Sequence, residues 1–269
     1  MDFTKYQNLK DKDRPLLILD SGVGGLGILK SMIQKYPVEN IIYICDNEML
    51  PLGNKNVKIL NRRIARMIKV IKKINPKGIL IACNTIDSIS GDVIRSSFPF
   101  INVYRIVEST MLQAVETTKT KKIALLATKN TIESQSYMKY ALAKKGLSIY
   151  GVECIELAKA IEDNIDVKQI FKQETSVLEG IEFDTLVLGC THYSYIKDSL
   201  IKDKYPNIQI VDSSEELIKN YNLNKNSILE NKANKQEINI YVTKITDEVF
   251  KTNVQKILNK DYLIEEFEI

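Results

Sequence analysis

The sequence predicts an α/β protein made of two pseudo-symmetric, doubly wound parallel-sheet domains related by an internal repeat of about 107 residues. Apolar runs of four to six residues alternate with longer segments of helical periodicity, which is typical of a parallel sheet covered on both faces. Several runs recur at a constant spacing. In each repeat one run ends in a cysteine, Cys83 or Cys190, 107 residues apart. Two facing copies would therefore set two thiols on opposite sides of one cleft.

Four pairs of segments carry the repeat. They are 16–21 with 123–128, 41–46 with 148–153, 78–85 with 185–192, and 98–103 with 205–210. A constant offset over four strand-like segments is the signature of a duplicated supersecondary unit.

The first unit contains strand candidates at 16–19, 41–45, 78–82 and 101–106. Between the second and third, the spacing of apolar residues predicts a helix over 57–74, which Pro76 should end. Its apolar face would consist of Ile59, Leu60, Ile64, Met67, Ile68 and Ile71.

The second unit repeats the pattern, with strands expected at 123–127, 147–152, 185–189 and 208–211. The remainder, 213–269, is more polar. In it we expect a surface loop over 222–236, a strand at 238–242 and a helix at 247–258.

Composition places the chain among ordinary globular proteins and excludes several classes. Its 269 residues are 44% hydrophobic and 27% charged, with a net charge of +4, so neither nucleic-acid nor membrane binding is expected. No apolar stretch approaches the roughly 18 residues that a membrane span needs, and the polar start lacks a signal-peptide core. The four cysteines form no CxxC pair, which favours free thiols in a reducing cytoplasm.

A glycine-rich loop at 20–27 follows the first strand. Gly22, Gly24 and Gly27 satisfy GxGxxG, and Asp46 ends the next strand, as a dinucleotide-binding domain would require. Two details oppose that interpretation. Asp20 would place a carboxylate near the pyrophosphate, and the equivalent loop of the second unit contains no glycine. The alternative is a tight turn whose N–H groups and Ser21 hydroxyl bind a small substrate.

A cysteine after a buried strand is usually a packing residue, and that interpretation stands for Cys45 and Cys154. Cys83 and Cys190 differ because each precedes polar residues suited to open a helix, whose N-terminus favours a thiolate. His192, the only histidine, could relay a proton or stabilise a thiolate at Cys190. The spacing fits no zinc site, and no GxSxG elbow is present.

These motifs resemble those of bacterial glutamate racemases, within the aspartate/glutamate racemase family. The resemblance rests on Asp20-Ser-Gly-Val-Gly-Gly-Leu, Ala82-Cys-Asn-Thr85 and Gly189-Cys-Thr-His-Tyr193. Further matches are Asp46, Pro51-Leu-Gly53, the run Ala127-Thr128-Thr131-Ser134-Tyr137, Glu162 and Tyr241-Val-Thr243. It covers nearly the whole chain from Pro15.

The resemblance implies cofactor-independent inversion at the α-carbon of glutamate, supplying D-glutamate for peptidoglycan. It implies that Cys83 and Cys190 are the acid/base thiols, assisted by Asp20 on one side and by His192 and Glu162 on the other. Substrate-binding residues would be Asp20, Ser21, Leu52, Gly53, Asn84, Thr85, Thr128, Thr131, Thr191 and His192. It also implies that the C-terminal segment returns to the first domain, so we expect domains at 1–106 plus 213–269 and at 107–212, in a homodimer.

The chain departs from the family pattern at several positions. Leu52 stands where tyrosine is usual, Ile86 and Asp87 replace small residues, and Ser194 replaces proline. Three alternatives stay open: a racemase for aspartate or a related amino acid, a nicotinamide-dependent oxidoreductase that uses the glycine loop, and a binding protein without turnover.

Overall fold

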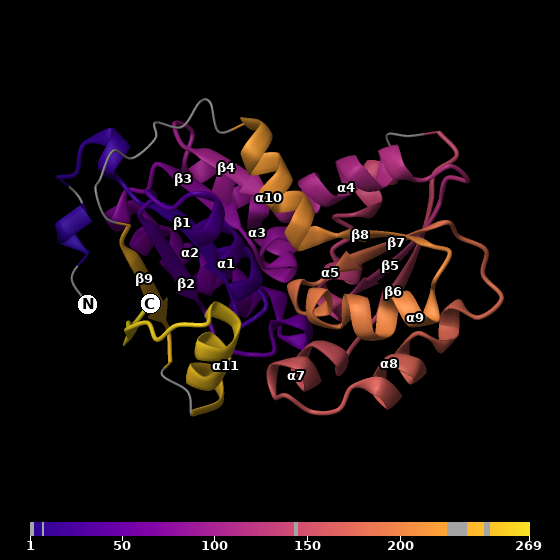
Figure 1. Ribbon diagram of the computed structural model, residues 1–269. Helices are drawn as coiled ribbons and strands as arrows, with labels where there is room; N and C mark the ends of the chain where they lie inside the picture. The colour runs from indigo at the N-terminus through magenta and orange to yellow at the C-terminus, as the bar shows by residue number, and fades with distance from the viewer. Residues whose placement is uncertain (1–2, 7, 143–144, 225–235, 245–247) are drawn as a thin grey trace.

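The computed structural model describes residues 3–6, 8–142, 145–224, 236–244 and 248–269. The chain forms two lobes, each with a central parallel sheet flanked by helices (Figure 1). This confirms the predicted fold class. The expected surface loop over 222–236 lies mostly outside the described residues, as does the first residue of the helix expected at 247–258.

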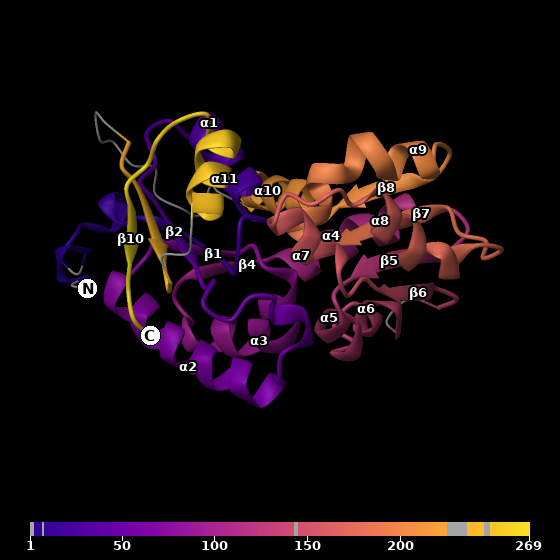
Figure 2. The ribbon, with the colours of Figure 1, turned by 90° about the horizontal axis from the view of Figure 1, so that it is seen from below.

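The first lobe contains a six-stranded sheet in the order β10-β9-β2-β1-β3-β4, with every neighbouring pair parallel. Its strands are β1 (Leu16–Asp20), β2 (Ile41–Cys45), β3 (Gly78–Ile81), β4 (Asn102–Arg105), β9 (Ile238–Val242) and β10 (Ile264–Glu266). The C-terminal strands thus complete the sheet formed by the N-terminal part of the chain, with β10 at its outer edge (Figure 2).

The second lobe contains a four-stranded parallel sheet in the order β6-β5-β7-β8. Its strands are β5 (Lys122–Ala127), β6 (Ser148–Glu153), β7 (Thr185–Gly189) and β8 (Gln209–Asp212). This order matches β2-β1-β3-β4 strand for strand, so the internal repeat is a structural one.

One part of the predicted repeat alignment is wrong by a single residue. Leu16 pairs with Ile41 in the first sheet, whereas Ile123 pairs with Ile149 in the second. The structural equivalent of Ile41 is therefore Ile149 rather than Ser148. β6 is an edge strand with several partly exposed residues, so its apolar pattern is too weak to define the register.

Helices cover both faces of each sheet. The longer helices are α1 (Leu26–Lys35), α2 (Val57–Ile74), α3 (Asn84–Ser97), α4 (Ile106–Thr117), α10 (Ser213–Asn224) and α11 (Glu248–Leu258). The shorter helices are α5 (Lys129–Glu133), α6 (Met138–Leu142), α7 (Leu157–Glu162), α8 (Lys168–Glu174) and α9 (Lys202–Lys204). Short 3-10 turns occur at Thr4–Tyr6, Asp11–Asp13, Leu52–Asn54, Ser176–Leu178 and Thr191–Ile196, and a single π turn at Lys197–Ile201.

The helix predicted over 57–74 has the expected bounds. The Asn56 side chain accepts a hydrogen bond from Lys58 N at its start, and Asn75 adopts the left-handed conformation at its end, next to Pro76. Its apolar face is buried except at Ile59, which is 47% exposed.

Two helices join the lobes. α4 follows β4 and α10 follows β8, and the two pack against each other, with α10 also contacting α1, β4, β7 and β8. In Figure 1 α10 lies between the lobes. One hydrophobic cluster consequently includes buried residues of both sheets, among them Leu16, Tyr43, Leu125 and Val187.

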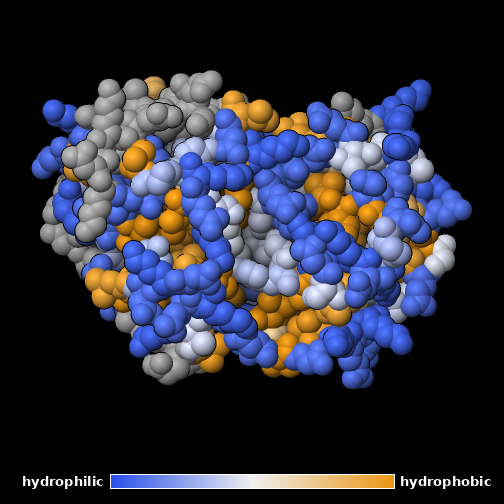
Figure 3. Space-filling model, in the orientation of Figure 1, coloured by the Kyte–Doolittle hydropathy of each residue, from blue (hydrophilic) through white to orange (hydrophobic). Residues whose placement is uncertain are grey.

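One face of the molecule is largely hydrophilic (Figure 3). On the face shown in Figure 3, hydrophobic side chains form separate patches between charged and polar ones. Among the described residues, no helix is both long and apolar enough to cross a membrane.

Candidate active site

A cleft of about 470 Å³ lies where the carboxyl ends of strands from both sheets meet. Ligands of open parallel sheets bind at such ends. Its lining comes from both lobes and comprises Ser21, Leu50, Pro51, Leu52, Gly53, Cys83, Asn84, Thr85, Thr128, Ala158, Lys159, Glu162, Cys190, Thr191 and His192. Both repeat-related cysteines therefore reach one cavity.

Cys83 follows β3 and occupies the N-cap position of α3. Its Sγ lies 3.2 Å from Ser21 Oγ, and the side chain is buried. Burial raises the pKa of the Cys83 thiol, and the charge of the nearby Asp20 raises it further. Without a bound ligand, this sulfur is therefore a neutral thiol at physiological pH.

Asp20 is buried behind the cleft rather than lining it. Its Oδ2 accepts hydrogen bonds from Gly25 N and from the Tyr43 hydroxyl, the latter at 3.0 Å. Burial raises the pKa of the Asp20 carboxyl, against the effect of these hydrogen bonds and of the charge on His192. Asp20 thus shapes the turn after β1 and acts on Cys83 through its charge.

Cys190, His192 and Glu162 form a hydrogen-bonded series. Cys190 Sγ lies 3.6 Å from His192 Nδ1, and His192 Nε2 lies 2.5 Å from Glu162 Oε2. Burial alone would lower the pKa of His192, but hydrogen bonds to Cys190 and Glu162 raise it well above its usual value. The raised pKa favours the imidazolium form of His192, whose Nδ1 lies next to Cys190 Sγ.

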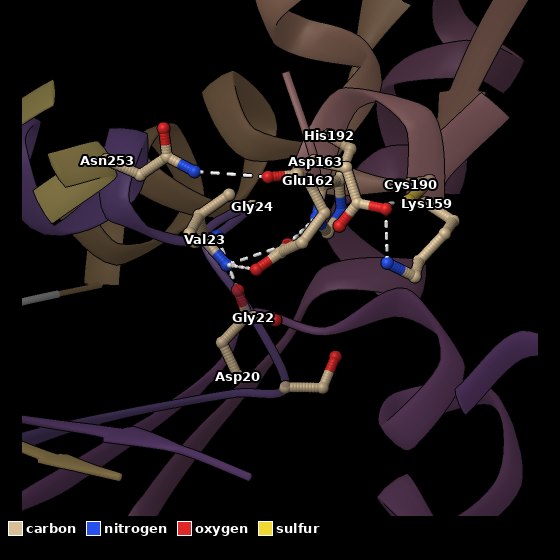
Figure 4. Close-up of polar contacts among 12 residues, drawn as sticks. Asp20, Gly22, Val23, Gly24, Lys159, Glu162, Asp163, Cys190, His192 and Asn253 are labelled. Atoms are coloured by element: carbon tan, nitrogen blue, oxygen red, sulfur yellow. Dashed lines mark hydrogen bonds and ion pairs between the residues drawn. The ribbon is translucent and has the colours of Figure 1, made fainter. Parts of the chain in front are cut away.

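The glycine loop of the first lobe is contacted by a side chain of the second lobe, Glu162. Val23 N lies 3.1 Å from Glu162 Oε2 and 3.2 Å from Oε1, and a Cβ on Gly22 would lie 2.6 Å from Glu162 Oε2. Figure 4 shows the Glu162 carboxylate directed at this loop. Because an anionic side chain occupies the N–H group that a pyrophosphate would need, the loop is poorly suited to a dinucleotide. Its close approach to the second lobe explains the requirement for glycine.

Three threonine hydroxyls meet across the cleft. Thr85 Oγ1 lies 2.9 Å from Thr128 Oγ1, which in turn lies 3.0 Å from Thr131 Oγ1. Thr85 belongs to the first lobe and the other two to the second. Thr131, which is 1% exposed, lies behind Thr128 and does not line the cleft. Thr131 would therefore affect a ligand in the cleft only by positioning the Thr128 hydroxyl.

The remaining predicted binding residues line the cleft directly. The Asn84 amide donates to Ser213 Oγ at 3.1 Å and accepts from the Tyr137 hydroxyl at 2.5 Å, which fixes its orientation. Leu52 and Gly53 belong to a 3-10 turn held by Asn130, whose amide donates to Leu52 O at 2.7 Å.

The departures from the family pattern have structural partners. Asp87 Oδ1 lies 2.6 Å from Arg105 Nε, and its Oδ2 accepts a hydrogen bond from Val107 N, in the first turn of α4. Ser194 Oγ donates to Asp212 Oδ1 at 2.8 Å. Ile86 is buried in the core of the first lobe. None of these residues lines the cleft, so they support the fold around it.

Four lining residues carry no assigned role in the sequence: Leu50, Pro51, Ala158 and Lys159. Ala158 and Lys159 lie on α7, the helix that ends at the predicted residue Glu162, but no motif includes them. Their position in the cleft depends on how α7 packs against the rest of the protein, and the local sequence does not specify that packing.

Cys45 and Cys154 are fully buried in the core, as expected for packing residues. Among the residues that the structure describes, no group of three or more His, Cys, Asp or Glu side chains could hold a metal ion.

Comparison with known proteins places this site in a family. Residues 32–220 match the family described as Asp/Glu/hydantoin racemase. The glutamate racemase of Buchnera aphidicola is 36% identical over 241 residues, covering 82% of this chain and 91% of that protein. Glutamate racemase 3 of Caldanaerobacter subterraneus is 33% identical over 259 residues, or 91% of this chain and 90% of that one.

Solved structures agree. The Francisella tularensis glutamate racemase, solved in complex with D-glutamate, superposes with a TM-score of 0.86 at 27% identity, covering 96% of this chain and 98% of that one. A glutamate racemase isoform from Bacillus anthracis gives a TM-score of 0.87 at 26% identity, with the same coverage. The chain therefore belongs to the bacterial glutamate racemases, a group of amino-acid racemases within the aspartate/glutamate racemase family.

Proposed function

We propose that the protein interconverts L- and D-glutamate with two cysteines, one on each face of the α-carbon: one thiolate removes the α-proton and the other thiol donates a proton to the opposite face. The observation that carries this proposal is that Cys83 and Cys190, from equivalent positions of two structural repeats, line the same cleft. A base on one face and an acid on the other invert a carbon without either group moving.

Each direction of the reaction needs one thiolate and one thiol. The surroundings of the two sulfurs support that asymmetry, because Cys83 is held as a neutral thiol while Cys190 contacts a protonated His192. In this state Cys190 is suited to remove a proton and Cys83 to supply one. After one turnover the two sulfurs have exchanged the roles of acid and base, which sets the site for the reverse direction.

The α-proton of an amino acid is a weak acid, so the site must stabilise the developing carbanion. We assign this to donors converging on the cleft: the Ser21, Thr85, Thr128 and Thr191 hydroxyls and the Asn84 amide. Thr131 supports Thr128, Asp20 acts through its charge, and Leu52 and Gly53 close one side. No cofactor is part of the proposal, and oriented donors in a partly enclosed cleft would supply most of the acceleration.

Glutamate is favoured as the substrate because the relatives are glutamate racemases and the Francisella tularensis protein was solved with D-glutamate. Its physiological role would be to supply D-glutamate for peptidoglycan. Aspartate is the alternative. The similarity to an aspartate racemase from Picrophilus torridus, with a TM-score of 0.54 at 20% identity, reflects the fold alone.

The test is circular dichroism of purified protein incubated with each enantiomer of glutamate and, separately, of aspartate. We expect loss of optical activity from both glutamate enantiomers and much slower change with aspartate. Faster racemisation of aspartate would overturn the substrate assignment, and stable signals with both amino acids would overturn the proposed activity.

The roles of the cysteines are tested by replacing each with alanine. Racemisation should fall by at least about 10²–10⁴-fold in both directions for Cys83→Ala and Cys190→Ala, since each supplies an acid/base group. Cys45→Ala and Cys154→Ala are the matched controls and should retain turnover. Full activity in either cleft mutant would refute the two-thiol mechanism.

The proposal includes the organisation of the molecule. We place the domain division at 1–106 plus 213–269 and at 107–212, and we propose a homodimer in the cytoplasm. Sedimentation of the purified protein at several concentrations tests the dimer, and a monomer throughout would refute it.

A further inference from the structure

Asn253, on the C-terminal helix α11, is buried against the end of α7. Its amide donates to the main-chain oxygen of Glu162 at 3.1 Å, and its Oδ1 accepts from Asn164 Nδ2 at 2.9 Å. The side chain is 3% exposed. Both polar groups of the amide thus have partners in the segment that carries Glu162, and Figure 4 shows the contact with Glu162.

This contact leads directly to one of the two cysteines. The carboxylate of Glu162 lies 2.5 Å from His192 Nε2, and His192 Nδ1 contacts Cys190 Sγ. α11 packs on α1 and is part of the first lobe, whereas α7 and Cys190 belong to the second. The first lobe therefore holds Glu162 at two points, its main chain by Asn253 and its carboxylate by Val23 N.

Among the residues that the structure describes, no hydrogen bond joins Cys83 to Glu162 or to His192. The hydrogen-bond partner of Cys83 is Ser21, in the same lobe, and the charge that affects it most is that of Asp20. A displacement of Glu162 would therefore act on Cys190 through His192 alone, whereas it could reach Cys83 only through the backbone of the glycine loop and Ser21, so Cys190 should be disturbed more.

We propose that Asn253 is a positioning residue for the half of the reaction that Cys190 performs, acting through Glu162 and His192. This inference rests on the proposed function. A purely structural role, in which Asn253 only anchors the end of α7, would lower the amount of active protein without favouring one cysteine over the other.

A reaction that needs only one of the two cysteines separates these possibilities. With 3-chloroglutamate, a thiolate removes the α-proton, the C–H electron pair forms a double bond and chloride leaves. The resulting enamine tautomerises and is hydrolysed to 2-oxoglutarate and ammonium. One cysteine is enough for this elimination, and each cysteine faces one configuration at the α-carbon. The isomer of 3-chloroglutamate that Cys190→Ala no longer converts is therefore the isomer whose elimination depends on Cys190.

The informative variant is Asn253→Asp, which keeps the shape and the acceptor for Asn164 but removes the donor to Glu162. We expect elimination of the Cys190-dependent isomer to slow about tenfold, since small misplacement of a catalytic group is costly. The Cys83-dependent isomer should change less than about twofold. The ratio of the two rates is independent of the fraction of folded protein, so partial misfolding does not obscure the result. Asn253→Leu, of similar volume, should give the same ratio.

Two further variants serve as controls. Asn164→Gly removes the other partner of Asn253 while preserving the left-handed backbone at that residue, and Gln255→Ala changes an exposed position of α11. Both should leave the ratio unchanged. Equal slowing of both isomers, or no slowing, in Asn253→Asp and Asn253→Leu would refute the positioning role while leaving the two-cysteine mechanism intact. A wild-type protein that neither racemises glutamate nor eliminates chloride would refute the proposed function and this role with it.

Discussion

His192 is the only histidine of the chain, so its ionisation can be followed without assignment. Its hydrogen bonds to Cys190 and Glu162 outweigh burial and raise its pKa well above the usual value. We therefore expect the two imidazole C–H signals of this one histidine in a proton NMR titration to remain those of imidazolium through pH 7. A midpoint at or below about 6.5, the value for an unperturbed histidine, would contradict this.

The same shift makes stability depend on pH. A group whose pKa is raised on folding stabilises the protein fully below its unfolded pKa, and that contribution is lost as the pH rises through the folded pKa. The free energy of unfolding in urea should consequently decline above about pH 6.5 more steeply in the wild type than in His192→Gln. Parallel pH profiles of the two proteins would contradict the raised pKa.

Lys159 is the only lysine or arginine among the residues that line the cleft, where it forms an ion pair with Asp163. For a dicarboxylate substrate, one cation at the edge of a partly enclosed site contributes on the order of 1 kcal/mol. We expect Lys159→Met to raise KM for glutamate about five- to tenfold with little change in kcat. A fall in kcat at constant KM would instead assign the lysine to the chemical step.

Residues in motifs at strand ends could be predicted, because the carboxyl ends of parallel strands converge. That reasoning places Cys83, Cys190 and His192 in one cleft, where the structure has them. It does not separate lining residues from those behind them, such as Asp20 and Thr131, since both kinds are buried polar side chains near a strand end.

At the scale of elements, a buried ion pair between Asp87 and Arg105 fixes α3 to the end of β4, at the residue that precedes α4. Gly91 in α3 faces it, and a Cβ there would overlap Asp87 Oδ1 and lie 2.5 Å from Arg105 Nε. Replacing glycine by alanine inside a helix normally stabilises by about 1 kcal/mol. Here we expect Gly91→Ala to destabilise, because separating a buried charge from its partner costs roughly 3–5 kcal/mol. Urea denaturation measures the difference.

The control for that substitution is Gly27→Ala in α1. A Cβ at Gly27 would have the Tyr195 hydroxyl at 3.7 Å, an ordinary contact. This variant should be neutral or slightly stabilised. Equal effects at the two glycines would show that space around Asp87 and Arg105 is not what requires Gly91.

Elements with strong periodicity could be predicted nearly to the residue, as α2 and β9 show. The sequence failed where tertiary pairing decides the outcome. β10 contains only three residues and exists because β9 provides an edge for it, and the register of β6 is set by β5 rather than by its own pattern.

At the scale of the whole molecule, the two lobes are joined by a common hydrophobic core as well as by the two connecting segments of the chain. The hydrophobic cluster that contains Leu16 and Tyr43 of the first sheet also contains Leu125 and Val187 of the second. Buried Leu217 and Tyr221 of α10 belong to the same cluster, between the lobes. A core common to both sheets couples their stabilities, in contrast to two domains joined by a linker alone.

We therefore expect the two lobes to unfold together. The chain has no tryptophan, so the suitable measurement is hydrogen–deuterium exchange by mass spectrometry in increasing urea, comparing peptides from β1 and β3 with peptides from β5 and β7. Their slowest amides should report the same free energy of opening. Leu217→Ala should lower that energy in both sheets equally, by about 2–5 kcal/mol, because it opens a cavity in the shared core. If instead β5 and β7 open at lower urea than β1 and β3, or if Leu217→Ala affects one sheet alone, the lobes are independent folding units and the relative placement of the two cysteines depends on the contacts across the cleft.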